Sequence, residues 1–306
     1  MSVSAQAGAA PVRRFAGRSK RVLPGFGLSL GISLFFVSLV LLLPLTGLVV
    51  ETSGMTWDQF VFTITDPRVV ESYKVTLWTA LAASLFNGLF GLLLAWVLVR
   101  YEFPGKRLID AVVDLPFALP TAVAGITLAT LFAQNGWYGQ ALAKAGIEVA
   151  FTPLGIVVAM AFTSIPFVVR TVQPVLEELS PADEEAAVSL GASDSRVFRK
   201  VIFPSLWPAL VTGIALSFTR SLGEFGAIIF IAGNTPYVSE VTSLMIFVRL
   251  QEYDYAAAAA LVAKIKDIVG SRWEDLLSKN PGMYEMDDGE HEISALVTEA
   301  LKDDYS

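Results

Sequence analysis

Long apolar runs without charged residues are the feature that most constrains this chain. A helix needs roughly 20 apolar residues to cross the hydrocarbon core of a bilayer, and helices satisfy their own backbone hydrogen bonds there. The sequence therefore predicts an all-α membrane protein, embedded in a lipid bilayer, with five clear transmembrane helices. The five predicted spans are residues 28–50, 75–99, 111–133, 154–172 and 207–232.

Composition narrows the chemistry that the chain can perform. Of its residues, 54% are hydrophobic and 17% are charged, whereas soluble proteins carry about 25% charged residues. A soluble helical protein is therefore disfavoured. The chain has no cysteine, and its one histidine is His291, which excludes thiol chemistry and a histidine-based catalytic or metal site within the spans. The spans also lack a paired acidic motif, which disfavours the alternative of a membrane-embedded enzyme.

Lysine and arginine are unequally divided between the loops that join the predicted spans. Such residues mark the cytoplasmic side of a membrane protein. The N-terminal arm and two of the loops form a basic side, which we predict to be cytoplasmic together with the N-terminus. Its eleven basic residues are Arg13, Arg14, Arg18, Lys20, Arg21, Arg100, Lys106, Arg107, Arg196, Arg199 and Lys200. The opposite loops offer only Arg68, Lys144 and Arg249, with Lys74 at a boundary.

The C-terminal part differs from the rest. The apolar run 256–263 would rise only about 12 Å as a helix, which is too short to cross a membrane. Residues 264–306 carry 11 acidic and 5 basic residues, with amphipathic patterns on both sides of an Asn280-Pro281-Gly282 turn. We therefore expect a cytoplasmic arm (1–27), a transmembrane domain (28–263) and an acidic, soluble-looking tail (264–306), with any sixth helix truncated or replaced. A fusion, a misassembled gene or a divergent C-terminus would each explain such a tail.

The loop at 177–206, on the predicted cytoplasmic side, reads as a capped helix followed by a second one. Ser180 before Pro181 is typical of an N-cap, and Asp183 and Glu184 suit the positive end of the helix dipole. Gly191 is expected to end the helix at its C′ position. Three residues, Ala182, Ala186 and Leu190, would form a smooth stripe. Ser193 or Asp194 would cap the second helix, and Pro204 would end it. The alternative is a surface connector with good caps.

This loop resembles the EAA loop of ABC importer permeases. Glu185-Ala186-Ala187 is followed after three residues by Gly191 and after nine more by Val201-Ile202-Phe203-Pro204. The family pattern is EAA, three residues, G, nine residues and I-x-L-P, so Val201 and Phe203 are conservative departures. The resemblance implies a type I ABC importer permease fold. It also implies that Glu185, Ala186, Ala187, Gly191 and Pro204 belong to a helix that docks on an ATPase subunit and couples ATP hydrolysis to alternating access.

Other segments resemble the sulfate/thiosulfate permeases of the CysT type. They are residues 114–125, 134–137, 221–227 and 251–256. The molybdate and tungstate permeases share part of this pattern and remain an alternative, as does a receptor or scaffold of another class. The resemblance implies a subunit of the bacterial inner membrane with three partners: an ATPase subunit, a second permease subunit in a heterodimer and a periplasmic sulfate-binding protein. No Walker A pattern occurs, so ATP and Mg²⁺ would bind the ATPase subunit, and no cofactor or nucleic acid is expected here.

Charged residues within the spans are candidates for the substrate path. Arg220 and Glu224 are four residues apart on one predicted helix, so they are expected to pair. Ionisable groups at membrane depth usually face the bundle interior or a water-filled path. A structural ion pair is the alternative, and Asp114 is expected to be a cap at the interface. The residues predicted to lie along the path are Pro120, Thr121, Arg220, Ser221, Gly223 and Glu224.

Overall fold

The computed structural model describes residues 26–279, with the surroundings of side chains described as far as residue 268. The chain divides into two compact units, residues 1–50 and residues 51–306, which we describe separately. In the first unit, α1 (Phe26–Val37) continues through the π-helical turn η1 (Ser38–Leu42) into α2 (Leu43–Ser53). None of the residues in these three elements is buried. This segment confirms the first predicted span.

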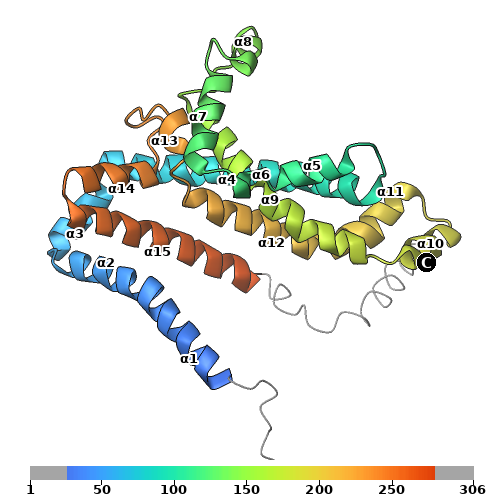
Figure 1. The fold of residues 1–306 in the computed structure, drawn as a ribbon, viewed down its shortest axis with the longest axis horizontal. Helices are drawn as coiled ribbons and strands as arrows, with labels where there is room; N and C mark the ends of the chain where they lie inside the picture. Colours follow the sequence, from blue (N-terminus) through green and yellow to red (C-terminus); the bar gives the residue numbers. More distant parts are fainter. Residues whose placement is uncertain (1–25, 280–306) are drawn as a thin grey trace, which may run out of the picture. The chain divides into compact units, whose positions relative to one another are not determined.

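Three long helices form the core of the second unit. They are α4 (Pro67–Arg100), α9 (Pro153–Glu178) and α12 (Phe203–Leu222), and each packs against the other two (Figure 1). α4 and α9 end where α12 begins, so α12 runs antiparallel to both. A cluster at that end includes Leu98, Val172, Leu176, Ala187, Val201 and Leu206. A second cluster, further along the bundle, includes Ala80, Ala83, Ile156, Met160 and Ile228.

Four helical segments of the described chain are long and apolar enough to cross a membrane, by length and composition. They are Phe26–Ser53, Pro67–Arg100, Pro153–Glu178 and Asp194–Leu222. The predicted span 111–133 instead forms three helices, α5 (Lys106–Val113), α6 (Leu115–Ala118) and α7 (Thr121–Phe132). The break before α7 follows from Pro120, because proline pushes the preceding Leu119 into an extended conformation (ψ 136°).

The predicted span 207–232 is also interrupted. α12 ends at Leu222, and a single helical turn, α13 (Ile228–Ile231), follows after five residues. The glycines at 223 and 226 flank Glu224 in this gap, and glycine is a poor helix former. The break places a buried carboxylate beside irregular backbone.

Both π-helical turns end two residues before a proline. η1 is followed by Leu43-Pro44, and η2 (Phe198–Ile202) is followed by Phe203-Pro204. A proline has no N–H to donate, and its ring clashes with the carbonyl four residues earlier. The wider π turn, in which the N–H of Phe203 donates to the carbonyl of Phe198, gives that ring room. The prediction that Pro204 ends the preceding helix was therefore wrong, since the helical segment runs on from Asp194 to Leu222.

The C-terminal helix α15 (Tyr255–Lys279) is 25 residues long and crosses the predicted boundary at 263–264 without a break. It packs on α14 (Thr242–Gln251) and α3 (Trp57–Thr65). Its Leu261, Ile265 and Ile268 join a cluster with Val69, Tyr73 and Met245. The apolar run and the first amphipathic pattern are thus one helix. The predicted turn at 280–282, the second pattern, His291 and the arm before residue 26 lie outside the described residues.

Candidate functional site

The helix α10 (Pro181–Ser189) has the local structure that the sequence predicts. The hydroxyl of Ser180 accepts a hydrogen bond from the N–H of Ala182, Pro181 occupies the first turn, and Asp183 and Glu184 follow. Gly191 has φ of +84°, the left-handed conformation that favours glycine. The N–H of the next residue, Ala192, donates to the carbonyl of Ala187 at 3.1 Å, which closes the end of the helix.

The two alanines of the EAA segment have different surroundings. Ala187 is only 1% exposed and belongs to the core cluster that includes Leu176 and Leu206. Ala186 is exposed, as are Glu185 and the rest of the predicted stripe, Ala182 and Leu190. One face of α10 is therefore fixed to the bundle, while the exposed part includes the small side chains of Ala182 and Ala186, which another protein surface can approach closely.

An ion pair and an aromatic contact attach this loop to α4. The guanidinium of Arg100, the last residue of α4, pairs with the carboxylate of Glu184. It also lies 5.2 Å from the ring centroid of Trp96. The ring of Trp96 in turn meets that of Phe198, in η2, edge-on at 5.5 Å. Sequence analysis missed Arg100 and Trp96, because nothing in the sequence indicates that they lie beside residues 84 or more positions away.

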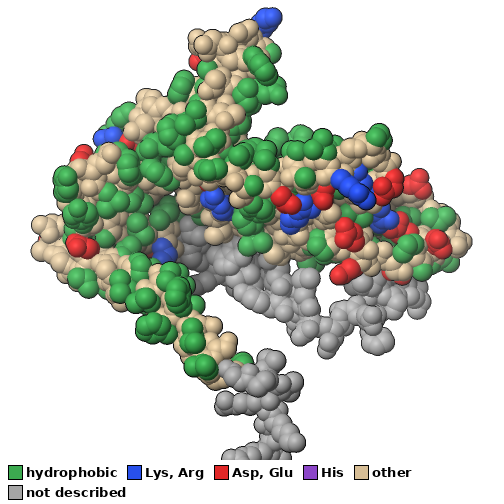
Figure 2. Space-filling view, viewed as in Figure 1, with side chains coloured by type: hydrophobic (Ala, Val, Ile, Leu, Met, Phe, Trp, Pro, Cys, Tyr) green, Lys and Arg blue, Asp and Glu red, His purple; other side chains and the backbone are tan. Residues whose placement is uncertain are grey.

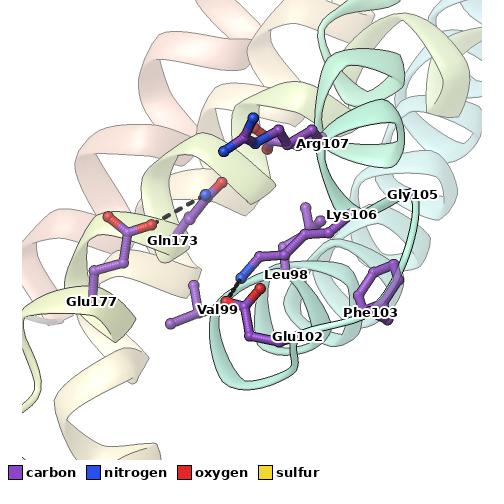
Figure 3. Close-up of a pocket in the computed structure, with 10 residues that line it drawn as sticks. Leu98, Val99, Glu102, Phe103, Gly105, Lys106, Arg107, Gln173 and Glu177 are labelled. Carbon is purple, nitrogen blue, oxygen red and sulfur yellow. Dashed lines mark hydrogen bonds and ion pairs between the residues drawn. The ribbon is translucent and has the colours of Figure 1, made fainter.

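Charged side chains gather at this end of the bundle, over α5, α10 and α11 (Asp194–Val197) (Figure 2). The structure thus brings together the two basic loops of the described chain. A cleft of about 520 Å³ also lies here, between α5 and the ends of α4 and α9 (Figure 3). Its charges are largely paired, since Lys106 donates to Glu102 at 2.6 Å and Gln173 to Glu177 at 3.2 Å. The cleft is therefore no concentrated basic site for an oxyanion.

Arg170 of α9 binds the broken third segment to the bundle. Its Nε and Nη2 donate to the two carboxylate oxygens of Asp114 at 2.9 and 2.7 Å, and its Nη1 donates to Asp110 at 2.6 Å. The side chain of Asp114 makes no cap hydrogen bond to α6. The prediction that Asp114 is a cap was therefore wrong, because the carboxylate binds a guanidinium on another helix.

The predicted pair at the end of α12 forms. Arg220 Nη1 lies 2.8 Å from Glu224 Oε2, and the Arg220 side chain is 34% exposed whereas that of Glu224 is 1% exposed. The other carboxylate oxygen of Glu224 accepts a hydrogen bond from the N–H of Ala227 at 3.0 Å. The guanidinium side chain of Arg220 is therefore partly exposed, whereas the carboxylate of Glu224 is buried.

Two of the predicted path segments meet beside this pair. Thr121, at the start of α7, packs so closely on Gly226 that a Cβ at residue 226 would lie 2.1 Å from the threonine hydroxyl oxygen. Gly226 is two residues from Glu224, so the break in the third segment and the break after α12 are adjacent. Pro120, which precedes α7, and Gly223 are both exposed.

Ser221 has different surroundings. It is fully buried and lies 3.1 Å from the hydroxyl of Ser164, in a polar cluster that joins α4, α9 and α12. Asn87 Nδ2 donates within this cluster to Ser164, at 2.9 Å, and to Ser217, at 3.1 Å. Side-chain hydrogen bonds of this kind hold helices together within membranes. Ser221 therefore acts in helix packing in this structure.

The bundle has the fold of an ABC importer permease. It superposes with a TM-score of 0.69, at 16% identity, on a chain of the solved bacterial ABC transporter involved in import of the acidic polysaccharide alginate, covering 86% of this chain and 97% of that chain. Residues 87–270 match the model of the family described as binding-protein-dependent transport system inner membrane component. The chain belongs to this family.

Curated relatives are similar over most of their length. The sulfate transport system permease protein CysT of Salmonella typhimurium (strain LT2) is 67% identical over 247 residues, which are 81% of this chain and 89% of that protein. The protein of the same name from Escherichia coli (strain K12) is 66% identical over 251 residues, 82% of this chain and 91% of that protein. The expected family resemblance is confirmed.

Proposed function

We propose that this chain is the membrane-spanning subunit of an ATP-driven importer that carries sulfate into the cell. The observation that carries the proposal is α10, which is anchored on one face by Ala187 and exposes small residues, including Ala186, on the other. The relatives named above are sulfate permeases, which favours sulfate over the molybdate and tungstate alternative. Neither an embedded enzyme nor a scaffold accounts for such a surface in a permease family.

The exposed face of α10 is the docking surface for a partner ATPase subunit, which binds ATP and Mg²⁺. Closure of the ATPase pushes α10, and the bundle alternates between inward-facing and outward-facing states. A rigid, capped helix suits this task because it transmits a push without bending. In this assignment Glu185 and Ala186 contact the partner, while Ala187, Gly191 and Pro204 shape and anchor the loop.

The substrate path runs past the breaks at 119–120 and 223–227. Arg220 is exposed enough to meet an anion, whereas Glu224 holds it in place from a buried position. Thr121, at the start of α7, and Gly223, in the gap after α12, lie near this pair. Selection of sulfate belongs to a periplasmic sulfate-binding protein, and a second permease subunit completes the path as a heterodimer. A weak, transient site in the membrane is then sufficient.

Orientation follows from the basic loops. The end of the bundle that bears α5, α10 and α11 carries Arg100, Lys106 and Arg107 from one loop and three further basic residues from the other. We place this end, and the N-terminus, in the cytoplasm of a bacterial cell, with α8 (Trp137–Ala143) on the periplasmic side.

Uptake of labelled sulfate tests the substrate. A strain that lacks its own sulfate permease subunit, but keeps the other transport subunits, is expected to take up labelled sulfate when this chain is expressed. Excess unlabelled sulfate should abolish the signal, and thiosulfate should compete if it shares the path. Molybdate at the same concentration should have little effect. Restored molybdate uptake without sulfate uptake would contradict the proposal.

A further inference from the structure

α4 is a single helix tied at both of its ends to segments that are distant in sequence. It has 34 residues, so its length of about 51 Å exceeds the roughly 30 Å of a bilayer core. After Pro67 in its first turn it contains no proline, so the usual cause of a sharp kink is missing from its interior. Its packing against α9 and α12 supports it within the core of the bundle.

At its C-terminal end α4 holds the loop at 177–206, which contains α10 and which we call the coupling loop. Arg100 pairs with Glu184 of α10, and both side chains are about one-quarter exposed. The stacking of the guanidinium on Trp96, four residues earlier on α4, restricts where Arg100 can point. A displacement of α10 along the axis of α4 would therefore act directly on the last turn of α4.

At its N-terminal end α4 holds the loop 233–241. Arg68 donates from Nε and Nη2 to the two carboxylate oxygens of Glu240, both at 2.7 Å, and the Glu240 side chain is 1% exposed. Bidentate pairs of this kind are geometrically specific as well as strong. The hydroxyl of Thr76 also accepts a hydrogen bond from the N–H of Thr242 at 2.8 Å. The tip of this loop exposes Tyr237 by 57% of its surface.

We infer that α4 is the rod that connects the coupling loop to the loop 233–241 at the opposite end of the bundle, with Arg100 and Arg68 as the positioning residues at its two ends. The inference rests on the proposed function, because it assumes that α10 is pushed by an ATPase. The Arg100–Glu184 pair is partly exposed on both sides, and such a pair adds little to folding stability. The carboxylate of Glu240 is buried, so the Arg68–Glu240 pair also stabilises the fold. Its role in transmitting movement is therefore tested by the transport ratio and not by stability.

Reconstituted complexes of the full chain with its ATPase, second permease and binding protein test the rod. The readout is sulfate transported per ATP hydrolysed, measured in the same vesicles. Glu184→Gln and Arg68→Gln should each lower this ratio about fivefold or more, which is the scale of a typical coupling between sites. Glu71→Gln is the matched control, because the ion pair that Glu71 makes among the described residues is with Lys74, on α4 itself. It should leave the ratio unchanged.

A charge swap separates coupling from folding. Glu184→Arg alone should lower the amount of sulfate transported per ATP hydrolysed. The double variant Arg100→Glu/Glu184→Arg should restore it. Glu240→Gln, which keeps the shape and an acceptor for Arg68, serves at the other end if Arg68→Gln does not assemble. If the variants at either end of α4 transport as much sulfate per ATP as the Glu71→Gln control, the inference that α4 is a connecting rod is wrong. A wild-type complex that hydrolyses ATP without moving sulfate contradicts the proposed function instead.

Discussion

Ala186→Arg is expected to abolish sulfate uptake while leaving the permease folded in the membrane. Ala186 is exposed on the face of α10 that points away from the bundle, so an arginine fits there without disturbing the chain's own packing. The same arginine would prevent close approach of a partner surface to this small-residue face. The measurement is capture of the ATPase subunit by the purified permease, together with labelled sulfate uptake. Both should be lost.

Ala187→Arg is the matched control, one residue along the same helix. Ala187 is 1% exposed within the core cluster, so an arginine there must displace neighbours such as Leu176 or bury an unpaired charge, at a cost of several kcal/mol. This variant should accumulate poorly and lose its thermal unfolding transition in detergent. Normal ATPase capture by Ala186→Arg would contradict the assignment of the docking face.

Arg220→Met is expected to destabilise the bundle by about 3 kcal/mol, because it leaves the carboxylate of Glu224 buried without its cation. This loss of stability is at the lower end of the range for breaking a buried ion pair, because Arg220 is one-third exposed. Thermal unfolding of the purified chain in detergent measures this. Arg249→Met is the control, because its partner Glu252 is 54% exposed and such a pair contributes about 1 kcal/mol or less.

The double variant Arg220→Met/Glu224→Gln separates the path from a structural ion pair. The neutral Gln keeps an oxygen that can accept from the N–H of Ala227, so most of the stability should return. Sulfate uptake should nevertheless stay about tenfold below that of the wild type, because the cation that meets the anion is missing. Uptake at the wild-type rate by the double variant would assign the pair to structure alone.

Local features of the site were predictable from the sequence because they depend on neighbouring residues. Ser180 as N-cap and Gly191 as the left-handed residue after α10 follow from short-range hydrogen bonding and backbone sterics, and both are confirmed. The Arg220–Glu224 pair follows from helical spacing and is confirmed too. The helical membrane fold was predictable too, because each apolar run is a continuous stretch of neighbouring residues.

Features that depend on contacts between distant residues were not predictable. The spacing of the EAA segment does not reveal that Ala187 faces the bundle while Ala186 faces away, since α10 is not strongly amphipathic. The pairing of Arg68 with Glu240 joins residues 172 positions apart. The break in the third predicted span has a local signal in Pro120, but its position beside the break after α12 depends on the packing of Thr121 on Gly226. Pro204 was misjudged because a π turn can accommodate proline within a helix.

The absence of cysteine in this chain permits a direct test of the central claim, which is that α10 lies in the cytoplasm against an ATPase. A single Ala186→Cys variant would be treated with a membrane-impermeant maleimide, in intact spheroplasts and in inside-out vesicles, and cross-linked within the assembled complex. We predict labelling only in inside-out vesicles, protection from labelling by the ATPase subunit, and a cross-link to that subunit. Labelling of residue 186 from outside intact spheroplasts would contradict the account.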